Sequence, residues 1–329
     1  MNMRKKNRAK RQDKRKVLIQ NQAEKWRVIL RWMATRNIVL IALGLGIIFI
    51  CTDVTKIKTG AKIRLNQFSH PESFEYLNGF LNEKRPFKKE EFLQYQYYYE
   101  QALGRIPEPA AIKTLLAYCH YALGDYNVSA KFYNQALADN PKIFWPFYNL
   151  ALMSYQVQKY DQAVMILKEA VGRNPHDTLA WFRSSEKIYQ PILKNAHIDE
   201  AALLSHLRKG YSESYILLIA AFYHQAQYQD MLAASLNALK ANIGEEARFA
   251  FYAGAASYFL KNYQKSVDYL NRSVEADPAQ KIGYYYLGLS HKALGNQKSY
   301  QNTIPKWSSL TEKEKNMVFP VEGLKVRLY

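Results

Sequence analysis

The pattern of apolar and polar positions divides this chain into two unlike regions. Near the N-terminus, 16 uncharged residues run from Asn37 to Thr52, and Ile38 to Cys51 is almost wholly apolar. Farther along, apolar side chains are interspersed with polar ones, and large aromatic residues recur beside small ones. The continuous apolar run is typical of a membrane segment, whereas the interspersed pattern predicts packed helices.

The interspersed region contains an internal repeat. Three segments align without gaps in their aromatic, small and proline positions: Gly124 to Pro141, Gln158 to Pro175, and Lys261 to Pro278. The first two closing prolines lie 34 residues apart. A fixed period of this length predicts structural units that stack on one another and bury their apolar flanks against their neighbours.

These segments resemble the tetratricopeptide repeat, whose pattern has Gly-x-Tyr at positions 15 to 17, Ala at 20 and 27, an aromatic residue at 24 and Pro at 32. Copies begin at residues 76, 110, 144, 178, 212, 247 and 281, so the resemblance covers residues 76–311. It implies an all-α superhelix of about six to seven helical hairpins. The copies at 178 and 212 are degenerate and lack the closing proline.

The repeat pattern has a physical reason that does not depend on the family. Large aromatic side chains on one helix need small residues opposite them for close packing, glycine permits a tight turn, and proline stops a helix. The residues expected to serve these structural purposes are Gly124, Tyr126, Ala136, Pro141, Tyr160, Ala163, Ala170, Pro175, Tyr263 and Pro278.

The resemblance also implies a concave groove lined by positions 2, 5, 9, 12 and 13 of the first helix in each copy. Positions 5 and 12 are mostly aromatic here, which favours an extended or helical peptide with apolar anchors as the ligand. The predicted groove residues are Tyr121, Tyr148, Tyr155, Phe182, Tyr189, Tyr223, Phe251, Tyr258 and Tyr285. Tyrosine is also common at position 12 for packing alone, so both interpretations of this ladder stay open.

Residues 37–55 are predicted to form one transmembrane helix. The uncharged stretch spans about 24 Å as a helix, and flanking residues such as Trp32 and Met33 extend it toward the roughly 30 Å hydrocarbon core. Three alternatives are a cleaved secretory signal, a lipoprotein signal at Cys51, and a buried helix of the globular domain. The long basic region before the run and the Ile50 that precedes Cys51 disfavour the first two.

The charge of the chain is concentrated before the apolar run. The formal net charge is +18, and residues 1–36 hold 13 Lys or Arg against 2 acidic residues. This asymmetry predicts a cytoplasmic N-terminus and a repeat domain on the opposite side, most simply a bacterial inner membrane facing the periplasm or the exterior. The basic tail suits anionic lipid, and no folded nucleic-acid module accompanies it.

No catalytic constellation is found in the sequence. There is no phosphate-binding Gly-rich loop, no H-E-x-x-H or G-x-S-x-G motif, and the two cysteines, Cys51 and Cys119, are isolated. His120 and His291 both fall at position 11, where an aromatic residue packs. We therefore expect no enzyme activity, no cofactor and no metal site.

These observations give five segments and two hypotheses for function. The segments are a basic cytoplasmic tail (1–36), a transmembrane helix (37–55), a linker (56–75), the repeat domain (76–311) and a C-terminal cap and tail (312–329). Pro305 is expected to end the last repeat, and Thr311 and Glu314 have capping-box spacing before a polar helix. The sequence predicts a membrane-anchored scaffold or adaptor for envelope assembly, secretion or quality control. The alternative is a non-catalytic subunit of a membrane enzyme complex, such as polysaccharide synthesis or export.

Overall fold

The computed structural model describes residues 88–103, 109–173, 176, 179, 200–316, 321 and 324–326. The chain divides into two compact units, Met1–Leu65 and Asn66–Tyr329, and all of the described residues belong to the second. The predicted basic tail, transmembrane helix and linker lie outside the described residues. Among the helices that the structure does describe, none combines the length and the apolar character that a membrane span requires.

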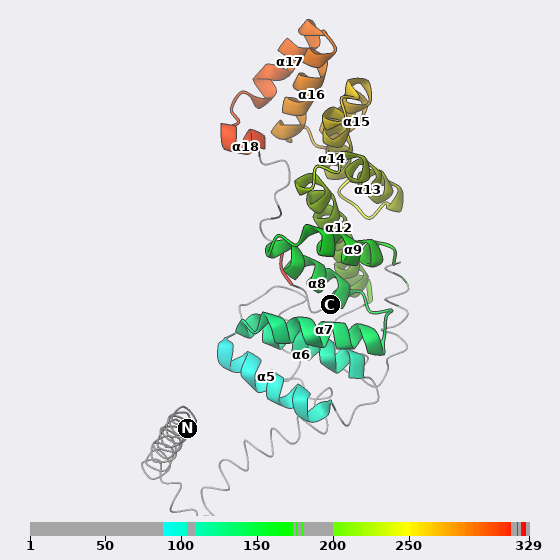
Figure 1. Ribbon diagram of the computed structural model, residues 1–329. Helices are drawn as coiled ribbons and strands as arrows, with labels where there is room; N and C mark the ends of the chain where they lie inside the picture. Colours follow the sequence, from blue (N-terminus) through cyan, green and yellow to red (C-terminus); the bar gives the residue numbers. More distant parts are fainter. Residues whose placement is uncertain are drawn as a thin grey trace, which may run out of the picture. The chain divides into compact units, whose positions relative to one another are not determined.

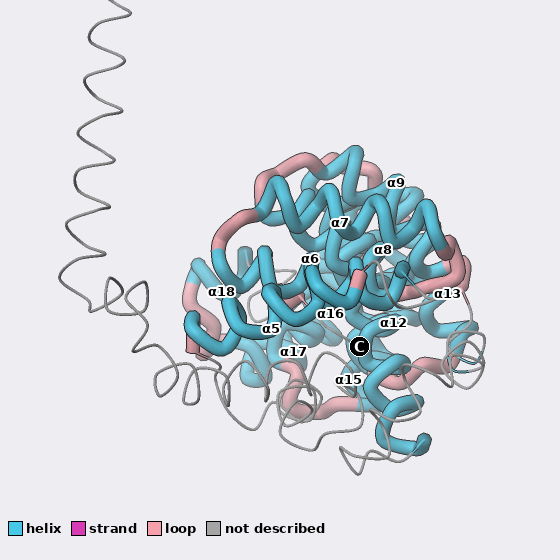
Figure 2. The backbone as a smooth tube through the Cα atoms, turned by 90° about the horizontal axis from the view of Figure 1, so that it is seen from below, coloured by secondary structure: helices cyan, strands magenta, loops and turns pink. Residues whose placement is uncertain are grey.

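The described residues form twelve helices and no strand (Figure 1). Helices that are neighbours along the chain pack against each other, from α5 and α6 through to α16 and α17. Figure 2 shows the same elements as helices joined by loops. The helices are α5 Lys89–Ala102, α6 Pro109–Leu123, α7 Tyr126–Asp139, α8 Trp145–Gln156, α9 Tyr160–Val171, α12 Glu200–His224, α13 Tyr228–Ala241, α14 Glu246–Phe259, α15 Tyr263–Ala276, α16 Lys281–Ala293, α17 Gln297–Trp307 and α18 Glu312–Asn316.

Each described hairpin turns at a residue with left-handed backbone geometry. These residues are Gly124, Gln158, Ala226, Lys261 and Gly295, with φ of 90°, 60°, 54°, 61° and 77°. All five fall at position 15 of their copies. In every turn, the N–H of the next residue donates to the carbonyl five residues before it, at 2.8–2.9 Å. This closure satisfies the last carbonyls of the first helix and fixes where the second begins.

Small residues allow the paired helices to approach closely, as the sequence pattern predicted. Ala136, Ala163 and Ala170 are fully buried, with 0% of their surface exposed. A Cβ atom added to Gly254 on α14 would lie 2.5 Å from Leu270 Cγ on α15, which is closer than real carbon atoms come. The absence of a side chain at this position therefore sets the spacing of that hairpin.

Two of the prolines that were predicted to stop helices lie just after a helix end. The prediction that Pro305 ends the last repeat is wrong. Pro141 and Pro278 directly follow the caps of α7 and α15, while Pro175 lies outside the described residues. Pro305, by contrast, lies inside α17, which continues to Trp307. Because Pro305 and Gln301 are both exposed, water can solvate the carbonyl that loses its helical hydrogen bond.

The degenerate region departs from the predicted register. A boundary between two copies was expected before Ser212, but α12 runs without interruption through 25 residues. Lys209 stands at position 32, where a proline would close the copy, so nothing stops the helix. Gly210 then lets α12 lie against α8, since a Cβ there would be 2.3 Å from Trp145 Cη2. Residues 180–199 lie outside the described residues.

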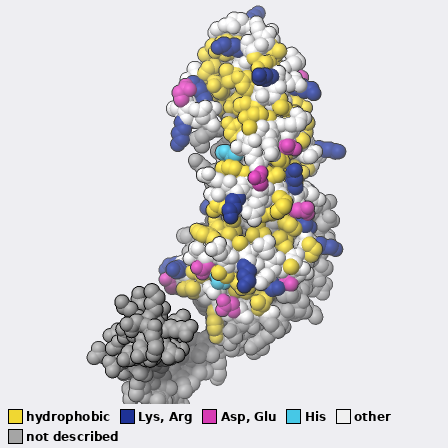
Figure 3. Space-filling model, in the orientation of Figure 1, with side chains coloured by type: hydrophobic (Ala, Val, Ile, Leu, Met, Phe, Trp, Pro, Cys, Tyr) yellow, Lys and Arg dark blue, Asp and Glu magenta, His cyan; other side chains and the backbone are white. Residues whose placement is uncertain are grey.

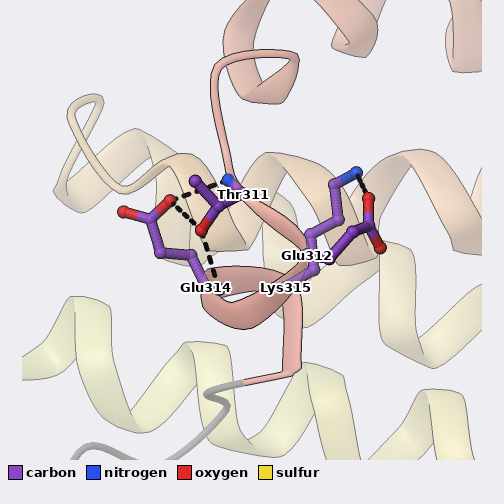
Figure 4. A network of polar contacts seen from close by, with 4 residues as sticks. All are labelled: Thr311, Glu312, Glu314 and Lys315. Carbon is purple, nitrogen blue, oxygen red and sulfur yellow. Dashed lines mark hydrogen bonds and ion pairs between the residues drawn. The ribbon is translucent and has the colours of Figure 1, made fainter.

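The capping box predicted at Thr311 is confirmed (Figure 4). The Thr311 N–H donates to Glu314 Oε2 at 2.7 Å, and the Glu314 N–H donates to Thr311 Oγ1 at 3.3 Å. These bonds satisfy two of the donors at the start of α18, which packs against α16. The polar helix expected after the last repeat is therefore present, as a short one.

Candidate peptide-binding groove

The strongest candidate for a site lies between α8 and α12. Tyr148 on α8 is fully buried, and its hydroxyl lies 2.9 Å from Glu213 Oε2 on α12. Glu213 itself is only 6% exposed, and it is the sole buried carboxylate within the described part of the chain. In the repeat register these are positions 5 and 2 of their copies, which are both groove-lining positions. The two helices thus bury the Glu213 carboxylate among apolar side chains. Burying such a group costs free energy unless it is hydrogen-bonded.

The same tyrosine contacts the C-terminal end of the chain. The Tyr148 hydroxyl lies 3.2 Å from the main-chain carbonyl oxygen of Lys325, which is 177 residues later in the sequence. A phenol has one proton, so the Glu213 carboxylate and the Lys325 carbonyl share it as acceptors. The site therefore binds a main-chain group of a non-helical segment through a side chain of a first helix.

Aromatic rings hold Tyr148 in place. Phe144 stacks on Tyr211 of α12 with ring centroids 4.2 Å apart, and Trp145 meets the Tyr148 ring edge-on at 5.7 Å. Trp145 also contacts the His206 ring at 5.2 Å. Because these rings are buried, the hydroxyl of Tyr148 has little freedom to point elsewhere.

The C-terminal segment, of which the structure describes Val321 and residues 324–326, packs on the buried core. Val326 is 5% exposed and belongs to the same buried cluster as Tyr148, while Val321 and Leu324 are partly buried against that cluster. The Leu324 N–H donates to the Val321 carbonyl at 3.2 Å. Lys325 is exposed, so its carbonyl is held while its ammonium group faces solvent. The sequence pattern predicted only a C-terminal cap and tail here, with no contact to the repeat domain.

The predicted tyrosine ladder has an internal packing partner in each described copy. Every position-12 tyrosine lies against the tyrosine five residues later, which opens the second helix. The ring-centroid distances are 5.4 Å for Tyr121–Tyr126, 5.2 Å for Tyr155–Tyr160, 6.3 Å for Tyr223–Tyr228 and 5.7 Å for Tyr258–Tyr263. The ladder therefore closes the hairpins, and its half-buried members Tyr121, Tyr223 and Tyr258 also keep exposed surface.

Burial sets the protonation of these tyrosines. Desolvation raises the pKa of Tyr121, Tyr155, Tyr223 and Tyr258 above the ordinary value of 10.0. In each case the charged phenolate loses more hydration than the neutral phenol does. These groups consequently stay neutral near pH 7 and can offer a hydroxyl but no charge.

The remaining predicted groove residues do not come together with Tyr148. Phe251 on α14 is 2% exposed and packs on Tyr286, with ring centroids 5.9 Å apart. Tyr285 on α16 is half-buried and meets the Trp307 ring of α17 at 5.1 Å. Phe182 and Tyr189 lie outside the described residues. The described groove residues thus extend over α6, α8, α12, α14 and α16, and Tyr223 of α12 also meets the Phe259 ring of α14, with ring centroids 5.7 Å apart.

Charged and apolar groups are distributed differently on the surface. On the face drawn in Figure 3, apolar side chains gather over many of the described helices, while Lys/Arg and Asp/Glu side chains are scattered. The described part of the chain contains no group of three or more His, Cys, Asp or Glu placed to hold a metal ion. His120 stacks on Phe132 at 5.4 Å, which is the packing role that its repeat position predicted.

Helical hairpins of fixed period, with a left-handed residue at each turn, define a helical repeat protein. The family model described as the tetratricopeptide repeat matches residues 96–142, which include the second half of α5 and the whole of α6 and α7. The sequence resemblance is therefore confirmed for this stretch of the chain. No curated protein matches the chain.

Several solved structures are similar to this chain at low identity. YrrB, described as a TPR protein with an unusual peptide-binding site, is 12% identical with a TM-score of 0.47, covering 69% of this chain and 98% of YrrB. MamA from Desulfovibrio magneticus RS-1 is 14% identical with a TM-score of 0.41, covering 63% and 96%. The TPR2AB domain of yeast Sti1, in a complex with pHSP90, is 15% identical with a TM-score of 0.30, covering 76% of this chain and 98% of that chain.

Proposed function

We propose that this protein is a membrane-anchored scaffold or adaptor that binds protein partners through the first-helix face of its repeat domain. One observation carries the proposal: the Tyr148 hydroxyl, held beside Glu213, already binds the main-chain carbonyl of a non-helical segment. When an extended peptide is bound, hydrogen bonds to its main chain give affinity and pockets for its side chains give specificity. The tetratricopeptide-repeat match at residues 96–142 supports the same class of function.

The anchoring part of the proposal rests on the sequence. The apolar stretch within residues 37–55 follows a strongly basic segment, and that order favours a single span with a cytoplasmic N-terminus. The repeat domain then lies across the membrane, most simply facing the periplasm or exterior of a bacterial cell. The basic tail of residues 1–36 adds attraction to anionic lipid. Envelope assembly, secretion and membrane-protein quality control are processes that use such a tethered adaptor.

Site-specific photo-crosslinking in cells tests the binding function. An aromatic photo-reactive residue would replace Gln156, an exposed residue at the groove-lining end of α8, in the full-length chain. The matched control replaces Met165, which is 65% exposed on the second helix α9. We expect a discrete crosslinked protein from the Gln156 variant and none from the Met165 variant. Equal crosslinking from both positions, or none from Gln156 in a folded chain, would refute the proposal.

A topology reporter tests the anchoring separately. The reporter would be fused after Tyr329 and would be active only outside the cytoplasm. We expect activity, together with a chain of uncleaved size in the membrane fraction. Activity inside the cytoplasm would refute the orientation, and a shortened soluble chain would show a cleaved signal instead of an anchor.

A further inference from the structure

We propose that the C-terminal segment occupies the surface of α8 and α12 beside Tyr148 and Glu213, which we call the groove, and that the partner displaces it. The partner's binding segment would then share its chemistry: a non-helical stretch with apolar residues at alternate positions and basic residues between them. This inference rests on the proposed function, because it names the ligand class for the same surface. Four observations lead to it.

The first observation is the path of the chain. The last helix, α18, ends at Asn316, and the chain then returns to α8, a helix that lies near the middle of the sequence. In Figure 1 a short red stretch of the C-terminal segment is drawn beside α8 and α9. Holding the stretch between Asn316 and Lys325 in one place reduces its conformational entropy, so the segment stays only where its contacts offset that loss.

The second observation is the alternation of burial along the segment. Leu324 is partly buried, Lys325 is exposed, and Val326 is 5% exposed. Alternate side chains point to opposite sides of an extended chain, so one side of the segment faces the apolar groove. The sequence continues the alternation with Arg327 and Leu328. A ligand with the same alternation would bury the same kind of side.

The third observation is that the polar contact is made to the main chain. Tyr148 donates to the Lys325 carbonyl oxygen, and every residue of any peptide carries such a group. The contact therefore fixes the path of the bound segment without depending on the side chain at that point. A partner segment can take over this hydrogen bond without loss, which makes replacement of the tail possible.

The fourth observation is charge. Glu213 places a carboxylate beside the bound segment, and that segment has Lys325 and Arg327 at alternate positions in its sequence. Coulomb attraction, weakened at Lys325 by its exposure to solvent, favours a basic ligand over an acidic one. An acidic extended peptide would meet like charge at Glu213. The groove is consequently expected to select basic-apolar segments.

The test uses the full-length chain and a labelled peptide with the sequence of residues 319–329, followed by fluorescence anisotropy. In a variant truncated after Asn316 the groove is empty, and the peptide is expected to bind. In the intact chain the tail competes, and the apparent affinity is expected to fall at least about tenfold, as it does when nine in ten grooves are occupied. A peptide with Asp in place of Leu324 and Val326 is the matched control, and it should not bind.

A second variant shows whether an effect of truncation comes from loss of the tail or from misfolding of the truncated chain. Val326→Asp leaves the length unchanged and removes only the buried anchor, so it should raise peptide affinity as truncation does. Tyr148→Phe in the truncated chain should lower that affinity, because the hydroxyl donor is lost. Equal peptide affinity of intact, truncated and V326D chains, or no binding by any folded chain, would overturn the inference.

Two further readouts separate this inference from the proposed function. If Gln156 crosslinks a partner in cells but truncation and V326D change neither crosslinking nor peptide binding, the adaptor function stands and the tail inference fails. If truncation turns a dimer into a monomer in sedimentation, the tail binds a second copy, and the intramolecular arrangement is refuted. Stronger crosslinking at Gln156 in the V326D chain would support both proposals together.

Discussion

The region of α8 and α12 and the region of α14 and α16 use the same repeat positions for different purposes. Position 5 is Tyr148 in one copy and Phe251 in the other, and both rings are buried. Tyr148 donates to Glu213 and to the tail, whereas Phe251 packs on Tyr286. Position 2 is the buried Glu213 in one copy and the exposed Arg248 in the other.

This comparison shows how a repeat acquires a site. Both regions have the same left-handed turns and the same packing of small residues against aromatic rings. These shared features therefore determine the helical hairpin, and they do not determine which ligand binds. A single hydroxyl and a single buried carboxylate change an apolar packing position into one that can bind a main-chain carbonyl. We infer that function in this protein lies where the repeat pattern is broken by polar groups rather than where it is followed best.

The largest expected effect comes from the close approach of α12 to α8. Gly210→Ala would place a methyl group 2.3 Å from Trp145 Cη2, so helices must move apart, and the unfolding free energy should fall by about 3 kcal/mol. Gly254→Ala is the matched change in the other region, and its loss should be similar. Chemical denaturation measures both, and a loss below about 0.5 kcal/mol would contradict the packing account.

Only the first of these two variants should disturb the groove. Gly210→Ala displaces Trp145, which contacts Tyr148, and should therefore weaken docking of the tail. Gly254→Ala acts on the α14–α15 hairpin and should leave binding of the labelled peptide unchanged. Equal effects of the two variants on peptide binding would break the distinction between the regions.

The second effect concerns the hydroxyl that distinguishes the two regions. Tyr148→Phe removes a donor from the buried Glu213 carboxylate and from the Lys325 carbonyl, and it should lower the unfolding free energy by about 1.5 kcal/mol. Tyr121→Phe is the control, because its hydroxyl makes one long contact of 3.5 Å to Gln156 and should matter little. Thermal and chemical unfolding of both variants provide the measurement.

The third effect is a loss of stability at high pH, to which Tyr286 of the α14–α16 region contributes. Burial raises the pKa of Tyr286 well above its ordinary value of 10.0. The unfolded chain releases this proton near pH 10 and the folded chain does not, so stability is retained below pH 10 and falls above it. Tyr286→Phe should reduce that fall by about 1.4 kcal/mol per pH unit. An unchanged pH dependence in the variant would contradict the assignment.

The smallest effect should be equal in both regions. Gln158 and Lys261 hold left-handed turns with φ of 60° and 61°, which glycine adopts without the cost that other residues bear. Gln158→Gly and Lys261→Gly should each raise the unfolding free energy by about 0.5–1 kcal/mol, while Gly124→Ala should lower it by about 1 kcal/mol. Unequal gains at residues 158 and 261 would show that the turns are not equivalent.

Local features of the fold could be predicted from the sequence. The turn at Gly124, the helix ends before Pro141 and Pro278, the buried Ala163 and the capping box at Thr311 each depend on residues a few positions apart. Such patterns act through the backbone of a single hairpin. They are therefore readable without knowledge of the rest of the chain.

The candidate site could be predicted only in part. Tyr148 could be predicted as a site residue because its repeat position lines the groove. Glu213 could not be predicted, because it lies in a degenerate copy where α12 continues through the expected boundary between two copies. The burial of Val326 depends on a contact between parts of the chain that are far apart in the sequence. An apolar alternation over three residues is too short to predict that contact. The ladder tyrosines were predicted as groove residues, and the structure gives them internal packing partners as well.

The most direct test of the account is the distance between spin labels at Lys325 and Gln156, both exposed, in a full-length chain with Cys51→Ala and Cys119→Ala. A docked tail predicts one narrow distance distribution, which should broaden and move to longer distances when excess peptide of residues 319–329 is added. A broad distribution in the intact chain without peptide, or a narrow one that peptide leaves unchanged, would contradict a groove that holds the tail and yields it to a partner.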